Sequence, residues 1–133
     1  MRTCFLGMDF GTGGAKACLM DADGEVLAYS FREFPLITEH PGWSEHEATG
    51  YWPAACSLIR EVMASAGVRG GDVRAVAVSS ALPSMVMVDE QGEPVHRGYN
   101  LMDKRATAEV QWLKEHIGED RIFELSGYRI EDQ

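Results

Sequence analysis

Short apolar runs separated by glycine-rich turns mark the first part of the sequence. Cys4 to Phe10 is mostly apolar, the turn Gly11-Thr12-Gly13-Gly14 follows, and a second apolar run extends from Ala15 to Met20. This arrangement predicts two strands joined by a glycine turn. The pair Asp23-Gly24 favours a tight hairpin into a third strand over residues 25–34, where side chains alternate between the two faces. The pattern therefore predicts three antiparallel strands.

A change of period indicates a helix in the middle of the chain. Apolar residues recur at intervals of three and four between Ala48 and Ala66, which is typical of an amphipathic helix, and Gly67 ends the pattern. The short β-branched run from Val73 to Val78 predicts a buried strand parallel to an earlier one, because it follows a helix. The order strand, helix, strand is a crossover connection, so the predicted fold class is α/β.

The remaining segments predict shorter elements. Residues 35–47 contain two prolines and few apolar side chains, so we expect a loop there. Met85 to Val88 predicts a short strand whose methionine side chains reach the core. A helix is expected from Asp103, as its N-cap, to Ile117, with a further helical turn over residues 120–125.

Composition and charge limit the partners of the chain. At 133 residues, 45% of them hydrophobic, it has the size of one domain with its own core. The formal net charge is −9, from 12 Lys plus Arg against 21 Asp plus Glu, and this field repels nucleic acid and anionic membrane surfaces. The three cysteines form no CxxC pair and lack metal-ligand spacing, which argues against a disulfide framework or a zinc site and predicts a cytoplasmic location.

Candidate chemistry is concentrated in the segment from Gly7 to Lys16. A carboxylate at the end of a buried strand, followed by a turn of small residues, lies beside backbone N–H groups that nothing bulky shields. Such a turn can hold phosphate oxygens, while the carboxylate holds a hydrated Mg²⁺ that neutralises them. The glycine spacing matches neither the Walker nor the dinucleotide-binding pattern, and an ordinary hairpin with positive-φ glycines is the alternative. The candidate phosphate ligands are Gly11, Thr12, Gly13, Gly14 and Lys16, and the candidate metal ligand is Asp9.

Other polar residues have structural as well as functional interpretations. The Asp103 carboxylate can accept hydrogen bonds from two hydroxyls of a polyhydroxylated ligand, although helix capping explains it equally well. Glu45 and Glu47 are interpreted as part of a solvated face. The four histidines are scattered along the chain, so we expect them in surface or loop positions and expect no hydrolytic triad.

Four segments resemble motifs of one protein family, in that family's order. Gly7 to Lys16 resembles the first phosphate motif of the actin-like, ribonuclease H-like ATPases. His40 to Glu47, followed by Tyr51-Trp52, is similar to the "PGW.EQ.P..WW" segment of the FGGY carbohydrate kinases. Val76 to Ser80 resembles the strand that leads to their sugar pocket, and Met102 to Ala106 resembles their "W.D.RA" segment. The similarity covers almost the whole chain, which therefore resembles an FGGY kinase.

This resemblance implies a partial ribonuclease H-like domain and a role in phosphoryl transfer. Residues 1–133 would form the N-terminal part of domain I of a kinase that moves the γ-phosphate of ATP to a sugar or polyol hydroxyl. Asp9 and the turn from Gly11 to Gly13 would face the phosphate and its Mg²⁺, while the loop after Val78 would line the substrate site. The implied substrate residues are Leu82, Pro83, Asn100 and Asp103.

Two departures from the family pattern concern this substrate site. Where xylulose kinase-like members carry "GQMHG", the chain reads Ser80-Ala81-Leu82-Pro83-Ser84, and where many members carry tryptophan it has Leu101. The expected pocket is therefore less polar and less aromatic than the xylulose pattern. Asn100 can restore one polar contact there or serve as a surface turn residue.

Two functional parts of the family are not expected within this chain. The catalytic aspartate comes later in the first domain and adenine is held mainly by a second domain, so both would lie beyond Gln133. We therefore expect no catalytic residue here and no sugar phosphorylation by the chain alone. The alternative is a stand-alone, non-catalytic association module whose open sheet edge pairs with another chain, including a second copy. The segments Pro41 to Glu45 and Asp103 to Arg105 disfavour a different actin-like ATPase.

Overall fold

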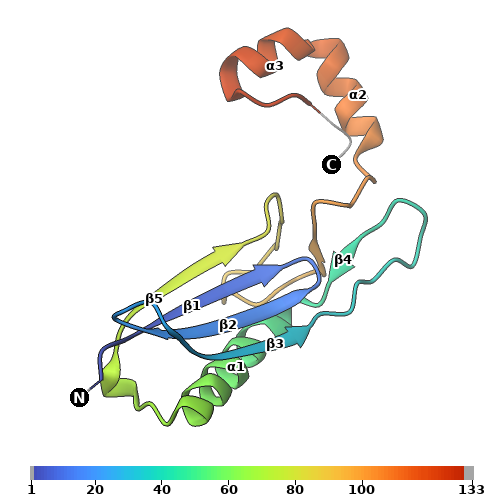
Figure 1. Ribbon diagram of the computed structural model, residues 1–133. Coiled ribbons are helices and arrows are strands. Elements are labelled where there is room, and N and C mark those ends of the chain that lie inside the picture. Colours follow the sequence, from blue (N-terminus) through green and yellow to red (C-terminus); the bar gives the residue numbers. More distant parts are fainter. Residues whose placement is uncertain (1, 131–133) are drawn as a thin grey trace.

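A four-stranded mixed sheet forms the body of the computed structural model, which describes residues 2–130 (Figure 1). Its strands are β1 (Cys4–Gly11), β2 (Gly14–Asp21), β3 (Val26–Glu33) and β5 (Val73–Ser80), in the order β3-β2-β1-β5. β1 pairs antiparallel with β2, and β2 pairs antiparallel with β3. β5 runs parallel to β1. These pairings confirm the predicted three antiparallel strands and the crossover.

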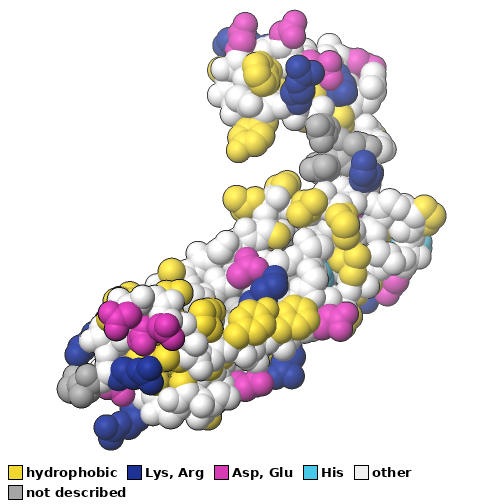
Figure 2. Space-filling model, in the orientation of Figure 1, with side chains coloured by type: hydrophobic (Ala, Val, Ile, Leu, Met, Phe, Trp, Pro, Cys, Tyr) yellow, Lys and Arg dark blue, Asp and Glu magenta, His cyan; other side chains and the backbone are white. Residues whose placement is uncertain are grey.

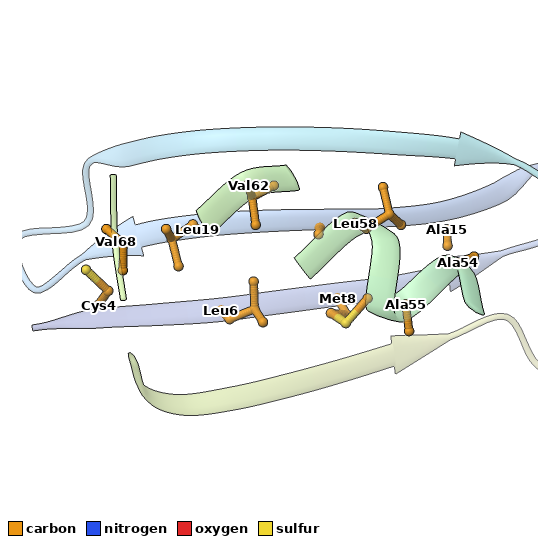
Figure 3. Close-up of a cluster of buried hydrophobic side chains, with 11 residues drawn as sticks. Cys4, Leu6, Met8, Ala15, Leu19, Ala54, Ala55, Leu58, Val62 and Val68 are labelled. Atoms are coloured by element: carbon orange, nitrogen blue, oxygen red, sulfur yellow. The ribbon is translucent and has the colours of Figure 1, made fainter. Parts of the chain in front are cut away.

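The core lies between this sheet and helix α1 (Tyr51–Ala66), which packs against β2 and β3 (Figure 3). Alternate residues of β1 point into the core, as the strand period of two requires. The buried residues of α1 recur at intervals of one, three and four, so they form one face of the helix. Gly67 ends the helix with φ of 62°, a conformation that glycine adopts without strain. The buried hydrophobic residues are Cys4, Leu6, Met8, Ala15, Ala17, Leu19, Ala54, Ala55, Leu58, Val62 and Val68.

The prediction that β5 is buried is wrong. Val76 is 57% exposed and Val78 is 65% exposed. α1 packs against β2 and β3, whereas β5 lies at the opposite edge of the sheet, beyond β1. β5 is therefore outside the part of the sheet that the helix covers. Figure 2 shows hydrophobic side chains at the surface of the sheet body and of the helices above it. β5 is therefore an edge strand with apolar side chains in solvent.

Two short strands outside the main sheet form a second, smaller sheet. β4 (Glu45–His46) pairs antiparallel with β6 (Gly98–Tyr99), so the segment predicted as a loop contains one short strand. A 3-10 turn, η1 (Ala48–Gly50), joins β4 to α1, and another, η2 (Gly70–Asp72), precedes β5.

The strand predicted at Met85–Val88 is wrong. Met85 and Val88 make only isolated bridges, to Tyr99 and Pro94, and both methionines of this segment are exposed at their side chains. A period of two is equally compatible with an extended surface segment, which explains the error.

The last two helices project away from the sheet (Figure 1). They are α2 (Thr107–His116) and α3 (Glu119–Ser126), and neither contains a buried residue. The predicted N-cap is wrong, because Ala106 occupies that position and the Asp103 side chain bonds elsewhere. The helical turn predicted at 120–125 is confirmed as α3, which is one residue longer at each end.

Candidate phosphate and substrate site

The phosphate turn, defined as the segment from Asp9 to Lys16, joins β1 to β2. Asp9 and Lys16 are cross-strand partners, and the Lys16 Nζ donates a hydrogen bond to Asp9 Oδ2 at 2.8 Å. This hydrogen bond is the main cause that raises the pKa of Lys16, and both side chains remain partly exposed. A Cβ on Gly11 would lie 3.2 Å from Nζ and 3.6 Å from Asp9 Oδ2. Glycine at this position therefore leaves the carboxylate and the ammonium uncovered.

The other glycines of the turn have different roles. Gly14 is buried with φ of 149°, and a Cβ there would overlap the carbonyl oxygen of Arg32 on β3. Close contact between strands thus explains Gly14, whose predicted phosphate contact stays a prediction. Gly13 is exposed at the tip of the turn, where a Cβ would meet nothing within 4 Å. Its carbonyl oxygen accepts a hydrogen bond from the Phe34 N–H at 3.3 Å.

His46 holds the phosphate turn from the neighbouring β4 strand. Its Nε2 lies 2.8 Å from the carbonyl oxygen of Thr12, which can only accept, so Nε2–H is the donor. The imidazole packs edge to face with Phe34 and Tyr51, with ring centroids 6.2 and 6.4 Å away. His46 is only 4% exposed, so the prediction of a surface or loop position is wrong for this histidine.

The preceding residue of β4, Glu45, belongs to an ion-pair cluster with Asp103 and Arg105. The Arg105 Nη2 lies 2.7 Å from Glu45 Oε1 and 2.7 Å from Asp103 Oδ2, and Nε donates to Asp103 Oδ1 at 2.9 Å. The guanidinium carbon lies 3.8 Å from the ring centroid of Trp43 and 4.4 Å from that of Tyr99. The Glu45 side chain is 3% exposed, so its interpretation as part of a solvated face is wrong.

Hydrogen bonds within this cluster favour the charged forms of Asp103 and Arg105. Burial opposes ionisation of Asp103, but hydrogen bonds from Arg105 and from the Ser44 amide outweigh it and lower the pKa of Asp103. The hydrogen bond to Asp103 is the main cause that raises the pKa of Arg105. Arg97 approaches from solvent, with its Nη1 3.5 Å from Glu45 Oε2. Arg97 also pairs with Glu39 at 3.0 Å and with Glu47 at 2.9 Å, so its guanidinium is shared among three carboxylates.

The carboxyl ends of β1 and β5 bring the phosphate turn and the predicted substrate loop together. The Ala81 N–H donates to the carbonyl oxygen of Phe10 at 2.9 Å, so the loop after β5 begins beside the turn. A cavity of about 320 Å³ is lined by Pro83, Asn100 and Asp103, and it is called the substrate cavity after these predicted substrate residues. Leu82 lines a second cavity of about 320 Å³, which shares Ser84 and Tyr99 with the first. Three of the four predicted substrate residues therefore share one cavity.

Sequence reasoning missed the roles of Glu45, His46 and Arg105. All three were present in the segments that carried the family resemblance, and the pattern of Asp103 and Arg105 was visible. Their partners, however, lie 34 and 60 residues away along the chain. No local pattern connects positions at such separations.

The predicted magnesium ligand Asp9 is a single, partly exposed carboxylate. Among residues 2–130 no group of three or more His, Cys, Asp and Glu side chains could hold a metal ion. Mg²⁺ at phosphate sites keeps several waters and takes only one or two carboxylates. The Asp9 carboxylate is partly exposed and is not covered by a side chain at Gly11, so it leaves room for a metal ion that keeps its waters.

In the same described part of the chain, no helix has the length and apolar content to cross a membrane.

The comparisons with known proteins agree with this fold. Residues 4–132 match the N-terminal domain of the FGGY family of carbohydrate kinases, and the chain belongs to this family. It is 32% identical over 130 residues to a glycerol kinase of Paracidovorax citrulli (strain AAC00-1), covering 97% of this chain and 26% of that protein. The chain spans about a quarter of the length of the curated relatives it matches.

Solved structures show the same architecture. The crystal structure of xylulose kinase from Rhodospirillum rubrum has a TM-score of 0.82 and 26% identity, covering 90% of this chain and 25% of that one. Gluconate kinase from Lactobacillus acidophilus has a TM-score of 0.84 and 23% identity, covering 93% and 25%. The predicted α/β, actin-like kinase fold is therefore confirmed.

Proposed function

We propose that this chain is the N-terminal part of an ATP-dependent kinase that transfers the γ-phosphate to a hydroxyl of a small sugar or polyol. The reaction belongs in the cytoplasm, where ATP is available. Residues 1–133 would form part of the first domain, and the catalytic base and the adenine contacts would come from outside this chain. By itself the chain would therefore not phosphorylate a sugar.

One observation carries the proposal. The phosphate turn and the substrate cavity lie at the same end of the sheet, beyond the carboxyl ends of the parallel strands β1 and β5. Ligands of open α/β sheets bind at this edge. β4 connects the two features, because His46 bonds to Thr12 of the turn and Glu45 bonds to Arg105 at the cavity. A phosphate donor and a hydroxyl acceptor would thus be held next to each other.

Each residue of the turn would have a separate task. Asp9 would hold Mg²⁺, and Lys16 would contribute a positive charge toward the phosphate oxygens. Thr12 and Gly13 would present their backbone N–H groups to the phosphate. The hydrogen bond from His46 to the Thr12 carbonyl oxygen would hold this part of the turn in place. Bound MgATP would supply the phosphoryl group, with the metal neutralising its charge. These residues contribute by positioning, which is the larger part of catalysis in phosphoryl transfer.

The substrate would occupy the cavity beside Asp103. Glycerol kinases and a xylulose kinase are among the relatives, and their names support a polyol or sugar acceptor. Asp103 already accepts hydrogen bonds from Ser44 and Arg105. These contacts fix its carboxylate in place and occupy both oxygens, so a substrate hydroxyl would have to share an oxygen with one of these donors.

A non-catalytic association module remains the second candidate, and the exposure of β5 favours it. An edge strand with apolar side chains in solvent is a template for pairing with another chain. A second copy of the chain could pair there.

A kinase assay on the polypeptide that the gene encodes, read to its own stop codon, separates the two candidates. The proposal predicts ADP formation that depends on a polyol or sugar. It also predicts a loss of at least about a hundredfold in Asp9→Ala, because the metal ligand is removed. Asp23→Ala, at an exposed turn at the other end of the sheet, should leave the rate unchanged. Absence of acceptor-dependent turnover, together with concentration-dependent dimerisation, would establish the association module instead.

A further inference from the structure

The side-chain amide of Asn100 is buried and only half used. Its Oδ1 accepts a hydrogen bond from the Met102 N–H at 2.9 Å, which fixes the orientation of the amide. Asn100 is 5% exposed, and its Nδ2 has no hydrogen-bond partner among residues 2–130. A buried amide nitrogen without a hydrogen-bond partner lowers the stability of the folded protein. Such groups are rare in folded proteins and often have a functional role. The prediction that Asn100 is a surface turn residue is wrong.

The position of Asn100 supplies that explanation. It lines the substrate cavity with Pro83, Met85, Tyr99 and Asp103. At about 320 Å³ the cavity is at the small end of the range for ligand sites. Ligand sites of this kind combine apolar walls with a few fixed polar groups that orient the ligand. Pro83 and Met85 provide apolar walls, and Asn100 with Asp103 provides the polar groups.

The charges around the cavity indicate an uncharged ligand. Arg105 also lines it, but its guanidinium is already paired with Asp103 and Glu45 at 2.7 Å each. An anionic ligand would therefore have to compete with two carboxylates for Arg105. The amide nitrogen of Asn100 is a neutral donor, which suits a hydroxyl or carbonyl oxygen.

We propose that Asn100 determines substrate specificity by donating a hydrogen bond from Nδ2 to an oxygen of a small, uncharged polyol or ketose in the substrate cavity. This inference rests on the proposed function and adds to it the neutral character of the substrate. A site built to hydrogen-bond one substrate oxygen rejects ligands that leave its donor unpaired.

Asn100 is the only asparagine among the 133 residues, which permits a direct test. Incorporation of asparagine labelled with ¹⁵N in the side-chain amide gives one pair of Nδ2 proton resonances in the NMR spectrum. The probes are glycerol and D-xylulose, which are uncharged, and gluconate, which is an anion. We expect saturable shifts of these resonances with an uncharged probe, at a Kd in the millimolar range, and no shift with gluconate.

Two variants separate recognition from stability. Asn100→Ser keeps a hydroxyl that can accept from Met102 but removes the amide donor, and should weaken binding of the uncharged probe about tenfold. Ser44→Ala is the matched control, because Ser44 Oγ is also buried without a partner but does not line the substrate cavity. It should leave the affinity within about twofold. Far-UV circular dichroism checks that both variants are folded.

The outcomes distinguish this inference from the proposed function. If uncharged probes shift the backbone amides of Ser84 and Asp103 but leave the Asn100 side chain unmoved, the substrate site stands and the role of Asn100 is refuted. The same holds if gluconate shifts Nδ2 as strongly, or if Asn100→Ser binds as well as Ser44→Ala. If no probe shifts any resonance of the cavity, the proposed substrate site itself is refuted.

Discussion

Replacing Arg105 by methionine removes the residue that pairs with both buried carboxylates of the site. Arg105 binds Asp103 through Nε and Nη2 and binds Glu45 through Nη2. Methionine retains much of the apolar contact with Trp43 but no charge. Asp103 then keeps the backbone donors of Ser44 and of residue 105, while Glu45 keeps Arg97 at 3.5 Å. Two buried carboxylates are left incompletely compensated.

The structure sets the expected magnitude. Removing one partner of a buried ion pair typically costs about 3–5 kcal/mol, because the other charge stays buried. Arg97 offsets part of this for Glu45, whereas the lost stacking of the guanidinium on Trp43 adds about 0.5–1 kcal/mol. We expect a loss of about 3 kcal/mol in the free energy of unfolding. With a urea m-value of about 2 kcal/mol/M, the midpoint falls by about 1.5 M.

The effect of pH has a defined sign. The pKa of Asp103 is lowered in the folded protein, so its contribution to stability is complete above its ordinary value of 3.8 and is lost as pH falls through the folded value. The difference between the native chain and Arg105→Met should therefore be largest near neutral pH and shrink below about pH 4.

Urea unfolding followed by far-UV circular dichroism measures this difference. Arg32→Met is the matched control, because Arg32 pairs with Glu61 at 3.4 Å and both side chains are about half exposed. Exposed pairs contribute about 0–1 kcal/mol. A loss below about 1 kcal/mol for Arg105→Met, or a loss equal to that of the control, would refute the reasoning that the cluster is a buried, compensated network.

Four further variants test the phosphate turn and the core. Gly14→Ala places a methyl group against the carbonyl oxygen of Arg32 and should lower the free energy of unfolding by about 2 kcal/mol or more. Gly13→Ala places its methyl group in open space and should lower it by less than about 0.5 kcal/mol. Thermal unfolding compares the two variants. Leu58→Ala opens a cavity at a fully buried position and should cost about 2–5 kcal/mol in urea unfolding; a loss under about 1 kcal/mol would contradict its place in the core. His46→Ala removes the hydrogen bond to Thr12, so amide hydrogen exchange of the phosphate turn should accelerate while exchange in α1 stays unchanged.

The strands and the first helix could be predicted because their signals are local. Alternation in β1 and β2, the glycine turn between them and the spacing of three and four in α1 each lie within one element. The exposure of β5 could not be predicted, since a β-branched run has the same pattern whether or not another element covers it. Burial depends on neighbours that the run itself does not encode.

The site was foreseeable in its residues but not in its contacts. Asp9, Lys16 and Asp103 were recognisable as charged groups at suitable positions. Glu45 and His46 were predicted at the surface because charged and polar residues in a proline-containing segment usually are. They are buried because Arg105 and Thr12, far away in the sequence, supply their partners. Long-range pairing of polar groups is a property of the folded chain.

The central claim is that the phosphate turn binds metal-complexed phosphate, and paramagnetic relaxation tests it most directly. Mn²⁺ with tripolyphosphate is added to the ¹⁵N-labelled chain, so that no adenine contact is needed. We expect the amides of Thr12 and Gly13 to broaden first, Asp9→Asn to abolish this broadening, and Asp23→Asn to leave it unchanged. Equal broadening in Asp9→Asn, or broadening confined to residues outside the phosphate turn, would contradict it.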